Sequence, residues 1–371
     1  MRVGIIGCGK IGLGGHARGY RSVPGVSVVA AADPTPERLA LAQSELGLGA
    51  EDCYRDYRAL LDRRDVDAVS VTTPQSARAP IVVAACQAGK HVLSEKPLAT
   101  TLADADAMIA AAKQHGVHLA TVHNYLFFPE YRTIVDLIGA GEIGDVEAVI
   151  LNWLGVDDLP GSAEYRPRWR HDVAASGGGV LMDMLHCVYV ASWLVGSPIR
   201  KVSALVDKRI EPEGTVEDAA YCRFEHEKGI SLVNVAWGKG PGSTEIMGTH
   251  GRILQFNASF GTTPFTGHEQ LHLVNERGAT AIEVTYERRP NSIYANFADC
   301  VREGQQPVAT GEDGKAVLEA VLGVYASAAL GREVRLPFST DDPVYLRGAL
   351  GIRELPLAED SRVVTRRIFG V

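Results

Sequence analysis

The sequence predicts two domains: an α/β domain with a doubly wound parallel sheet, followed by an α+β domain with an open, mainly antiparallel sheet. Two observations carry this prediction. Up to about residue 122, short apolar runs alternate with helical patterns, as expected for parallel strands joined by helical crossovers. Beyond that point, strand-like runs follow one another at hairpin spacing. A chain of 371 residues is long enough for both domains.

The first element is an apolar strand over residues 3–6, which ends in the pattern G-x-G-x-x-G at Gly7, Gly9 and Gly12. In a dinucleotide site the first glycine allows a tight turn, and the second lets the backbone approach a pyrophosphate. The third lets the next helix pack on the strand, and that helix offers free N–H groups to the anion. The pattern therefore predicts a Rossmann domain, although glycine-rich turns also end ordinary strands.

The second strand, over residues 26–32, supports this prediction because it ends at Asp33, 21 residues after Gly12. A carboxylate at this place accepts hydrogen bonds from the adenosine ribose of a dinucleotide. It also repels a 2′-phosphate, so the sequence favours NAD over NADP. The alternative is that Asp33 serves only the turn before Pro34.

The remaining elements of the first domain follow from helix signals and periodicity. Thr35 and Pro36 are typical of an N-cap and a first helical position, Thr101 is typical of a second N-cap, and Gly89 of a helix end. Helices are expected over residues 36–46, 79–88 and 102–115, and strands over 68–72, 91–94 and 117–123.

In the second domain, alternating and apolar strand candidates indicate a sheet with one covered face. Strands are expected over residues 146–153, 201–207, 219–224, 230–237, 245–249 and 252–256, and helices over 129–138, 292–301 and 312–330. The predicted domains are 1–122 for the dinucleotide and 123–340 for substrate and oligomer contacts, followed by a C-terminal arm over 341–371.

Composition and charge argue against several other classes of protein. Apolar residues make up 46% and charged residues 22% of the chain, and the net charge of −8 gives no attraction for nucleic acid or an anionic membrane. Without an apolar run of about eighteen residues, we expect no membrane span, no signal peptide and a cytoplasmic protein. The six cysteines form no C-x-x-C pair, which predicts no metal site and no disulfide framework.

A first catalytic candidate lies after the strand expected over residues 91–94, where Glu95, Lys96 and Pro97 follow. Open parallel sheets bind ligands at the carboxyl ends of their strands, so Lys96 would lie beside the nicotinamide end of the cofactor. Pro97 has no N–H and restrains the backbone of Lys96, which would fix the direction of the ammonium group. The alternative is an ordinary surface lysine.

A second candidate is the stretch over residues 176–186, where three glycines lead into an expected helix. Asp183 and His186 are three residues apart, so they would share a helix face that continues through Tyr189. A carboxylate and an imidazole on one face suit proton transfer. A lone histidine on such a helix would more often be structural, and it is the combination that favours catalysis.

These residues together resemble the Gfo/Idh/MocA family, which includes glucose–fructose oxidoreductase and inositol dehydrogenase. The likeness covers about residues 1–337 and is carried by GCGKIG, the AAD strand end, VDAVSVTTP, AGKHVLSEKP, HNYLFFPEYR, GAGEIGDV, SGGGVLMDMLH, GTHGRIL and TGEDGKAVLEAVLGVYASAALGREVRLP. The pairing of EKP with GGG-x-L-x-D and a histidine close behind is specific to this group.

The resemblance implies an NAD(P)-binding Rossmann domain and a substrate domain whose open sheet commonly mediates oligomerisation. It also implies oxidation of a secondary alcohol, or reduction of a ketone, on a sugar, glycoside or cyclitol. By family role, Lys96, Asp183 and His186 would be catalytic, and Glu95, Asn124 and Pro74 would lie near the nicotinamide and its ribose. The complete predicted set is Gly7, Gly9, Lys10, Ile11, Gly12, Asp33, Thr73, Pro74, Glu95, Lys96 and Asn124 for the cofactor, and Lys96, Tyr125, Trp169, Arg170, Asp183 and His186 for the substrate.

Three stretches depart from the family pattern. Family members usually place the histidine four residues after the aspartate, where this chain has Cys187, whereas His186 comes three residues after Asp183. The usual Pro-Asn-x-x-His reads PQSAR at residues 74–78, and the usual Asn-x-Arg-Phe reads NYLF at 124–127. A helix permits either histidine spacing on one face, so the catalytic assignment is kept.

In the predicted mechanism, His186 takes the proton of a substrate hydroxyl as hydride leaves the same carbon. Lys96 stabilises the developing alkoxide and, being cationic, lowers the proton affinity of the imidazole. Asp183 hydrogen-bonds the substrate or orients His186. Lys96 as the base is an alternative that the sequence leaves open.

Substrate recognition is expected from residues 153–170, a loop rich in aromatic and arginine residues. Trp169 would stack on a polyhydroxylated ring, and nearby arginines would donate to its hydroxyls or to an anionic group. Those arginines are Arg166, Arg168 and Arg170. In the alternative, Trp169 packs in the core and the arginines pair with Asp172 and Glu164. Expected structural residues are His16 and His171, and Tyr189 is a further candidate substrate contact.

The main prediction is therefore a cytoplasmic NAD-linked dehydrogenase of a small carbohydrate or cyclitol, with a homo-oligomeric assembly as dimer or tetramer. Two other functions stay open. One is redox-neutral glycoside cleavage, in which transient oxidation acidifies a neighbouring C–H and the cofactor is recycled. The other is a non-catalytic NAD-binding regulator, against which the presence of Lys96, Asp183 and His186 argues.

Overall fold

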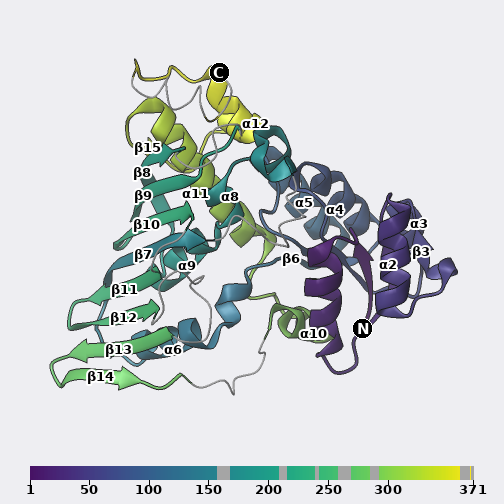
Figure 1. Cartoon of the computed structure of the whole chain (residues 1–371), viewed down its shortest axis with the longest axis horizontal. Coiled ribbons are helices and arrows are strands. Elements are labelled where there is room, and N and C mark those ends of the chain that lie inside the picture. The colour runs from purple at the N-terminus through teal and green to yellow at the C-terminus, as the bar shows by residue number, and fades with distance from the viewer. Residues whose placement is uncertain are drawn as a thin grey trace. The chain divides into compact units, whose positions relative to one another are not determined.

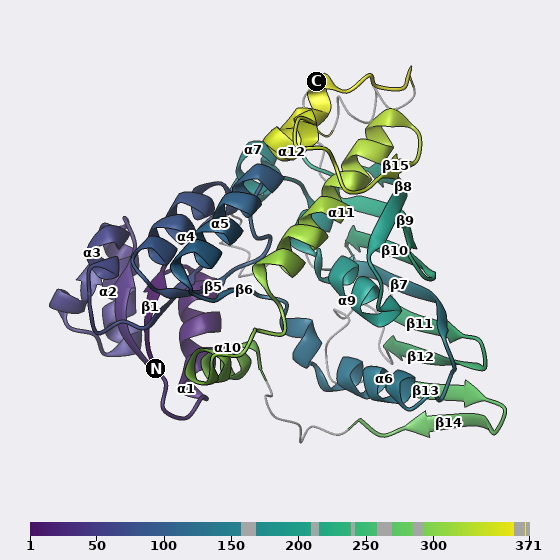
Figure 2. The same cartoon turned by 180° about the vertical axis from the view of Figure 1, so that it is seen from behind.

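The computed structural model describes residues 1–156, 168–208, 215–238, 242–257, 269–284, 292–359 and 368. Figures 1 and 2 show the chain from two opposite sides. It forms two compact units, the first made of Met1–Asn124 and Glu287–Ala316, and the second of Tyr125–Tyr286 and Val317–Val371. Each unit has a sheet of its own.

The first unit contains a six-stranded, wholly parallel sheet, as predicted. Its strands are β1 (Arg2–Ile6), β2 (Ser27–Ala32), β3 (Cys53–Tyr54), β4 (Ala68–Val71), β5 (His91–Ser94) and β6 (Leu119–Thr121), in the order β3-β2-β1-β4-β5-β6. The order reverses between β1 and β4, so the carboxyl ends of these strands border a topological switch point. Open α/β sheets bind ligands there.

Helices cover this sheet. They are a π-helix at Ile11–Ala17, α1 (Arg18–Arg21), α2 (Pro36–Leu46), α3 (Tyr57–Leu61), α4 (Arg78–Gln87), α5 (Leu102–His115) and α10 (Ile293–Glu303). Because crossovers between parallel strands are right-handed, the helices that follow β1 and those that follow β4 lie on opposite faces. The fold is therefore doubly wound, as the sequence predicts.

Some local details differ from the sequence expectations. Strand β3 was missed, since two residues are too few to show a periodic pattern. Thr35 precedes α2 as expected, but its side chain makes no capping hydrogen bond. The cap at Thr101 is confirmed, because its side chain accepts the N–H of Asp104 at 3.0 Å.

Helix α10 belongs to the first unit, although the sequence placed residues 123–340 together in the second domain. The ring of Tyr294 packs edge-on against His16 and Tyr20, with centroid distances of 5.3 and 5.1 Å. At the other end of the helix, Arg302 Nη2 donates to the carbonyl oxygen of Pro24 at 2.7 Å. These aromatic contacts pair residues far apart in the chain, which no local pattern reveals.

The second unit contains a nine-stranded mixed sheet. Its strands are β7 (Val146–Val156), β8 (Ile199–Asp207), β9 (Ala219–His226), β10 (Ile230–Trp237), β11 (Gly242–Gly248), β12 (Gly251–Asn257), β13 (Glu269–Asn275), β14 (Gly278–Ile282) and β15 (Val334–Arg335), in the order β14-β13-β12-β11-β7-β10-β9-β8-β15. Neighbouring strands are antiparallel except β7 and β10, which are parallel. The predicted mainly antiparallel sheet is confirmed. The sequence did not identify β13, β14 or β15 individually; β14 is almost wholly exposed and β15 has two residues.

One face of this sheet is covered by helices. The helices of the unit are α6 (Pro129–Gly139), α7 (Val173–Ser176), α8 (Val180–Asp183), α9 (His186–Val195), α12 (Pro343–Arg347) and the greater part of α11 (Gly311–Leu330). Helix α9 packs on β7 and β10, and Ser327 of α11 accepts the N–H of Ala204 in β8 at 3.1 Å. Residues Val149, Leu151 and Trp153 of β7 are buried on this side.

The opposite face of the sheet carries partly exposed apolar side chains. Leu205, Ile230 and Met247 are 72%, 37% and 40% exposed. At its centre Asn234 Nδ2 donates to Asn152 Oδ1 at 2.7 Å, and Asn152 in turn donates to the Ser243 hydroxyl. Among the described elements, the helices of this unit gather on the other side of the sheet (Figures 1 and 2).

No single helix in the described part of the chain is long and apolar enough to cross a membrane, although one bent pair, Val173–Asp183 with His186–Val195, passes on length and composition alone.

Candidate functional site

The glycine loop after β1 has the geometry of a dinucleotide cradle. Gly7 has a φ of +100°, and a Cβ there would come within 2.9 Å of the Thr72 backbone. A Cβ on Gly12 would overlap the carbonyl oxygen of Gly7, so the third glycine is needed for close packing of helix on strand. A Cβ on Gly9 would meet nothing within 4 Å. The second glycine thus borders open space, where a pyrophosphate can approach the backbone.

Asp33 lies next to this loop at the carboxyl end of β2. Its Oδ2 accepts the N–H of Cys8 at 2.8 Å, and its Oδ1 accepts the N–H of Thr35 at 2.9 Å. The carboxylate is partly exposed, so lone pairs remain for a ribose hydroxyl. Burial, with the nearby charge of Asp33, raises the pKa of the Cys8 thiol to about 12, so this thiol stays protonated at neutral pH.

The strand ends after β4 and β5 contribute the other predicted cofactor contacts. Thr73 and Pro74 follow β4, while Glu95 and the partly exposed Lys96 follow β5. Because the strands are parallel, these residues lie on the same sheet edge as the glycine loop. Of the remaining predicted residues, Lys10 and Ile11 are exposed beside Gly9, and Asn124 lies in the turn that follows β6.

Arg78 donates hydrogen bonds to both of these strand ends. This role was not predicted from the sequence. The guanidinium is buried and donates from Nη2 to the Thr73 carbonyl at 2.6 Å. Its Nη1 donates to the carbonyls of Glu95, at 2.8 Å, and of Pro97. Burial lowers the pKa of Arg78 to about 10, so the group keeps its charge at neutral pH. The sequence offered only a hint, an arginine where the family usually has histidine.

Glu95 is held from two sides. Its Oε1 lies 3.1 Å from Nε2 of the buried His16, and its Oε2 accepts the backbone N–H of Lys96 at 3.0 Å. Burial raises the pKa of Glu95, but the His16 hydrogen bond and the charges of His16, Lys96 and Arg78 outweigh it and the net pKa is lowered. Glu95 is therefore ionised at neutral pH and fixes the backbone of Lys96.

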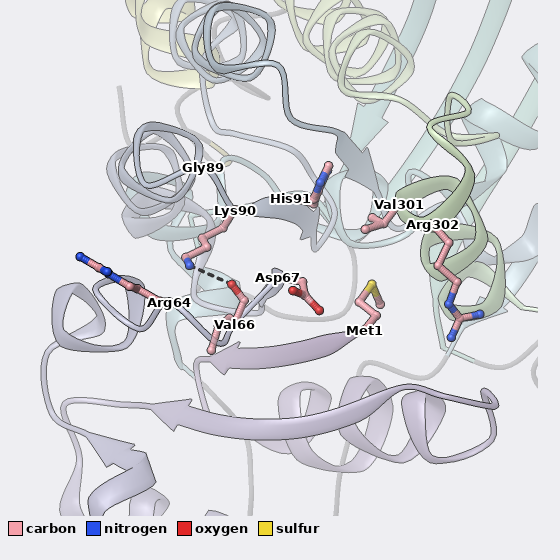
Figure 3. Close-up of a pocket in the computed structure, with 9 residues that line it drawn as sticks. All are labelled: Met1, Arg64, Val66, Asp67, Gly89, Lys90, His91, Val301 and Arg302. Atoms are coloured by element: carbon pink, nitrogen blue, oxygen red, sulfur yellow. Dashed lines mark hydrogen bonds between the residues drawn. The ribbon is translucent and has the colours of Figure 1, made fainter.

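A cavity of about 490 Å³ in the same unit lies at the other edge of the sheet (Figure 3). Asp67 precedes β4 and Lys90 precedes β5, so the cavity borders the amino ends of the strands. Lys90 Nζ donates to the carbonyl oxygens of Arg63 and Val66 at 2.6 and 2.8 Å. The side chains of Arg64 and Arg302 point away from the centre of the cavity in Figure 3. This cavity is separate from the predicted cofactor edge.

In the second unit, the structure corrects the prediction that Asp183 and His186 share one continuous helix. Helix α8 ends at Asp183 and α9 begins at His186. The stretch Val173–Asp183 and the helix His186–Val195 are bent by 48° relative to each other. Met184 has φ −104° and ψ 32°, outside the helical range, which interrupts the regular hydrogen bonding. The two side chains therefore project from separate helices.

His186 lies in an aromatic cluster. Its Nδ1 is 3.0 Å from the Tyr189 hydroxyl, which also accepts the backbone N–H of Tyr125 at 2.9 Å. The Tyr125 ring is centred 4.4 Å from the imidazole and 5.4 Å from the Trp153 ring. The cluster is buried and fixes the plane of the imidazole. Tyr125, a predicted substrate contact, thus packs directly on His186.

Asp183 is paired with Arg170, whose Nη1 donates to Asp183 Oδ1 at 2.7 Å. The guanidinium also lies over the Trp169 ring, 5.2 Å from its centroid. The local acid Asp172 instead caps α7 through the N–H of Ala174. Trp169 is half-buried rather than in the core. The predicted donor Arg166 and its alternative partner Glu164 lie outside the described residues, as does the side chain of Arg168.

A buried carboxylate that the sequence analysis missed lies beneath the glycines before Asp183. Glu217 Oε2 accepts the N–H of Gly179 at 2.8 Å, and Oε1 accepts the N–H of Leu181 at 3.0 Å and the hydroxyl of Tyr325 at 2.8 Å. The Glu217 carbonyl accepts the N–H of Val180 at 3.1 Å. No pattern in the sequence links this acid to glycines 38 residues earlier.

Within the described residues, no group of three or more His, Cys, Asp or Glu side chains is arranged to hold a metal ion. All six cysteines are free thiols.

Comparison with known proteins gives two family matches. Residues 1–123 match the model described as "Oxidoreductase family, NAD-binding Rossmann fold", and residues 131–254 match the "GFO/IDH/MocA C-terminal domain". A 1,5-anhydro-D-fructose reductase of Ensifer adhaerens is 30% identical over 90% of this chain and 98% of the relative. A myo-inositol 2-dehydrogenase of Thermotoga maritima is 29% identical over 89% of this chain and 96% of the relative.

A solved structure is similar over nearly its whole length. The aldose-aldose oxidoreductase of Caulobacter crescentus, complexed with glycerol, has a TM-score of 0.79 and 25% sequence identity, and the match covers 91% of this chain and 99% of that one.

Proposed function

Because the chain belongs to the Gfo/Idh/MocA family of NAD-binding oxidoreductases, we propose that it transfers a hydride between NAD and a secondary alcohol of a neutral sugar, glycoside or cyclitol. The observation that carries the proposal is the position of Lys96. It follows β5 on the same sheet edge as the open cradle at Gly9 and the carboxylate of Asp33. A cation at that edge suits an alcohol whose oxygen becomes negative during the reaction.

The cofactor would be held by residues of the first unit. Gly9 would leave room for the pyrophosphate, Asp33 would accept from the adenosine ribose, and Glu95 and Asn124 would contact the nicotinamide ribose. When bound, NAD supplies the hydride acceptor. The carboxylate of Asp33 disfavours a 2′-phosphate, which supports NAD over NADP.

The proposed catalytic set is Lys96, Asp183 and His186. His186 Nε2 takes the proton of the substrate hydroxyl, which requires Nδ1 to carry its hydrogen and donate it to the Tyr189 hydroxyl, 3.0 Å away. Lys96 stabilises the developing alkoxide. Asp183 accepts a hydrogen bond from a neighbouring substrate hydroxyl. Lys96 as base is the alternative assignment.

The ion pair between Arg170 and Asp183 supports a neutral substrate. Arg170 is already paired with Asp183, so the pair presents one donor group and one acceptor group without net charge. Trp169 beside Arg170 offers a ring face for stacking on a sugar ring, and Tyr125 borders His186. A polyol has both donors and acceptors and fits such a site.

We further propose a homo-oligomer formed through the open sheet face, and a cytoplasmic location. The exposed apolar side chains Leu205, Ile230 and Met247 support the first proposal, since an apolar face of this kind is stabilised by a partner. Six free thiols support a reducing compartment.

The test is to follow reduced nicotinamide by its absorbance while NAD, then NADP, is offered with sugars, glycosides, inositols and sugar acids. Lys96→Ala should lower kcat by about a thousandfold while the Kd for NAD changes little. Lys113→Ala is the matched control, because Lys113 is an exposed lysine of the same unit paired only on the surface with Glu312.

Unchanged turnover in Lys96→Ala would remove the proposed mechanism. Product formation from a glycoside without net reduced nicotinamide would favour redox-neutral cleavage instead. Tight NAD binding without turnover across the panel would favour a regulatory protein.

A further inference from the structure

Glu217 satisfies three successive backbone donors at the start of α8. One carboxylate oxygen accepts from Gly179 and the other from Leu181, while the Glu217 carbonyl accepts from Val180. The first N–H groups of a helix have no partner within it and must find one elsewhere. Here a single buried residue supplies all three acceptors.

The glycines before α8 are required by this contact. A Cβ on Gly179 would overlap the Glu217 carbonyl oxygen, and a Cβ on Gly178 would overlap the Tyr325 hydroxyl. The glycine run therefore allows the close approach of Glu217 and Tyr325. The N–H groups of Gly179, Val180 and Leu181 are already engaged and are not free for a substrate or a phosphate.

Backbone hydrogen bonds connect the residues that Glu217 holds with Asp183. The N–H of Asp183 donates to the Gly179 carbonyl at 2.9 Å, and the N–H of Met184 donates to the Val180 carbonyl at 2.7 Å. Gly179 and Val180 are the residues whose own N–H groups Glu217 accepts. Two short hydrogen-bonded steps thus connect Glu217 with the residue before the bend that leads to His186.

The contact uses both oxygens of the Glu217 carboxyl group as acceptors. Its two oxygens accept two N–H groups and the Tyr325 O–H at once. A glutamine has one acceptor oxygen, and its NH₂ would face an N–H or the hydroxyl. A buried, unpaired donor costs free energy, so the segment would have to shift to relieve it.

We propose that Glu217, held by Tyr325, is a positioning residue that sets the place of Asp183 and His186 for proton transfer. The inference rests on the proposed function, because it assumes that Asp183 and His186 act on the substrate. Glu217 touches neither the reacting atoms nor the cofactor in this role.

The experiment compares Glu217→Gln and Tyr325→Phe with wild type by amide hydrogen exchange and by steady-state kinetics. We expect exchange to be about tenfold faster in peptides spanning residues 176–190 and unchanged in the first unit. We expect kcat to fall by about tenfold to a hundredfold in Glu217→Gln, and less in Tyr325→Phe, while the Kd for NAD and the KM for the alcohol stay within about threefold.

Tyr20→Phe is the matched control. Tyr20 is another fully buried tyrosine, whose hydroxyl lies 2.9 Å from Ser70 Oγ in the first unit. This variant should lose comparable thermal stability with no change in kcat or in exchange over 176–190. An equal fall of kcat in Tyr20→Phe would show a general stability effect and overturn the proposal.

Two other outcomes would also overturn it: unchanged exchange over 176–190 in Glu217→Gln, or faster exchange there with full kcat. If wild type turns over no member of the panel, the proposed function fails, and the exchange rates alone decide whether Glu217 orders this segment.

Discussion

Asp33 is the residue on which we propose that cofactor choice depends. Its two oxygens accept the N–H groups of Cys8 and Thr35, which fixes the carboxylate beside the glycine loop. A fixed anion favours a ribose with two hydroxyls and disfavours one that carries a phosphate. In this proposal, the preference for NAD follows from one side chain whose position is set by two backbone contacts.

We expect Asp33→Ala to weaken NAD binding by about tenfold and NADP binding much less, because only NAD loses a favourable contact. Titration of the protein with each reduced cofactor, followed by fluorescence, measures both Kd values. Asp62→Ala, an exposed acid in the same unit, is the control. Equal losses for the two cofactors would contradict the ribose contact.

His123 makes stability depend on pH. Burial lowers its pKa to about 3, with the charge of Glu95 opposing the shift, so the folded protein holds a neutral imidazole. The unfolded chain takes up a proton near its ordinary pKa of 6.5. The stabilisation is therefore present above pH 6.5 and is lost as the pH falls from 6.5 towards 3.

We expect wild type to lose about 2 kcal/mol of unfolding free energy from this group between about pH 6.5 and 5. His123→Asn should remove that loss, and His115→Asn, at an exposed position, should not. Urea unfolding at several pH values gives the difference between each variant and wild type. Burial raises the pKa of Glu217 to about 7, so the stability that this group contributes is lost as the pH rises from 4.5 to 7, opposite to the effect of His123. The test therefore uses only the difference in unfolding free energy between each variant and wild type. Parallel curves for wild type and His123→Asn would contradict the assignment.

Among the elements, the ends of β4 and β5 act as a pair because Arg78 joins them. The residue opens α4, yet its guanidinium reaches three carbonyl oxygens on two strand ends. Loops at a ligand-binding edge have few contacts of their own, and a buried cation that binds both limits their motion. The predicted contacts Thr73 and Glu95 depend on this link for their position.

Arg78→Met should lower the unfolding free energy by about 3 kcal/mol, because three buried carbonyls lose their donor. It should also weaken NAD binding, since the loops after β4 and β5 lose the hydrogen bonds that hold them together at the proposed cofactor edge. Thermal unfolding and cofactor titration measure the two effects. Arg18→Met removes an exposed arginine of the same unit and should change neither. Destabilisation with unchanged NAD affinity would show that Arg78 supports the fold without ordering the site.

At the scale of the whole molecule, the second unit presents a nine-stranded sheet with one face covered by its helices. The other face exposes Leu205, Ile230 and Met247 around a centre of hydrogen-bonded amides. A mixed apolar and amide surface suits a second copy of the same chain, which would present the same groups in return.

If the chain assembles through this face as proposed, Leu205→Glu should shift the assembly towards smaller species, because it would place a charge in an apolar interface. Analytical ultracentrifugation of wild type and variant measures the change. Leu346→Glu, at an exposed leucine of α12, is the control and should leave the assembly unchanged. Identical sedimentation of wild type and Leu205→Glu, each as an oligomer, would place the interface elsewhere.

Much of the fold could be predicted because its signals are local. The glycine loop, the acid after β2, the cap at Thr101 and the alternation of strands and helices each depend on residues close together in the chain. The strands missed were those with two residues or with no buried face. The bend between α8 and α9 was also missed, because a helical period continues through a break when both helices pack on the same core.

Local signals in the sequence are enough to predict a parallel dinucleotide-binding unit, a mainly antiparallel second unit and the residue types of the candidate site. How those residues are held depends on contacts that form only in the folded chain. His16 meets Glu95 across 79 positions, Glu217 meets Gly179 across 38, and Arg78 meets Glu95 across 17. Propensity and periodicity act over a few residues, whereas a buried polar group must find its partner wherever the folded chain brings one.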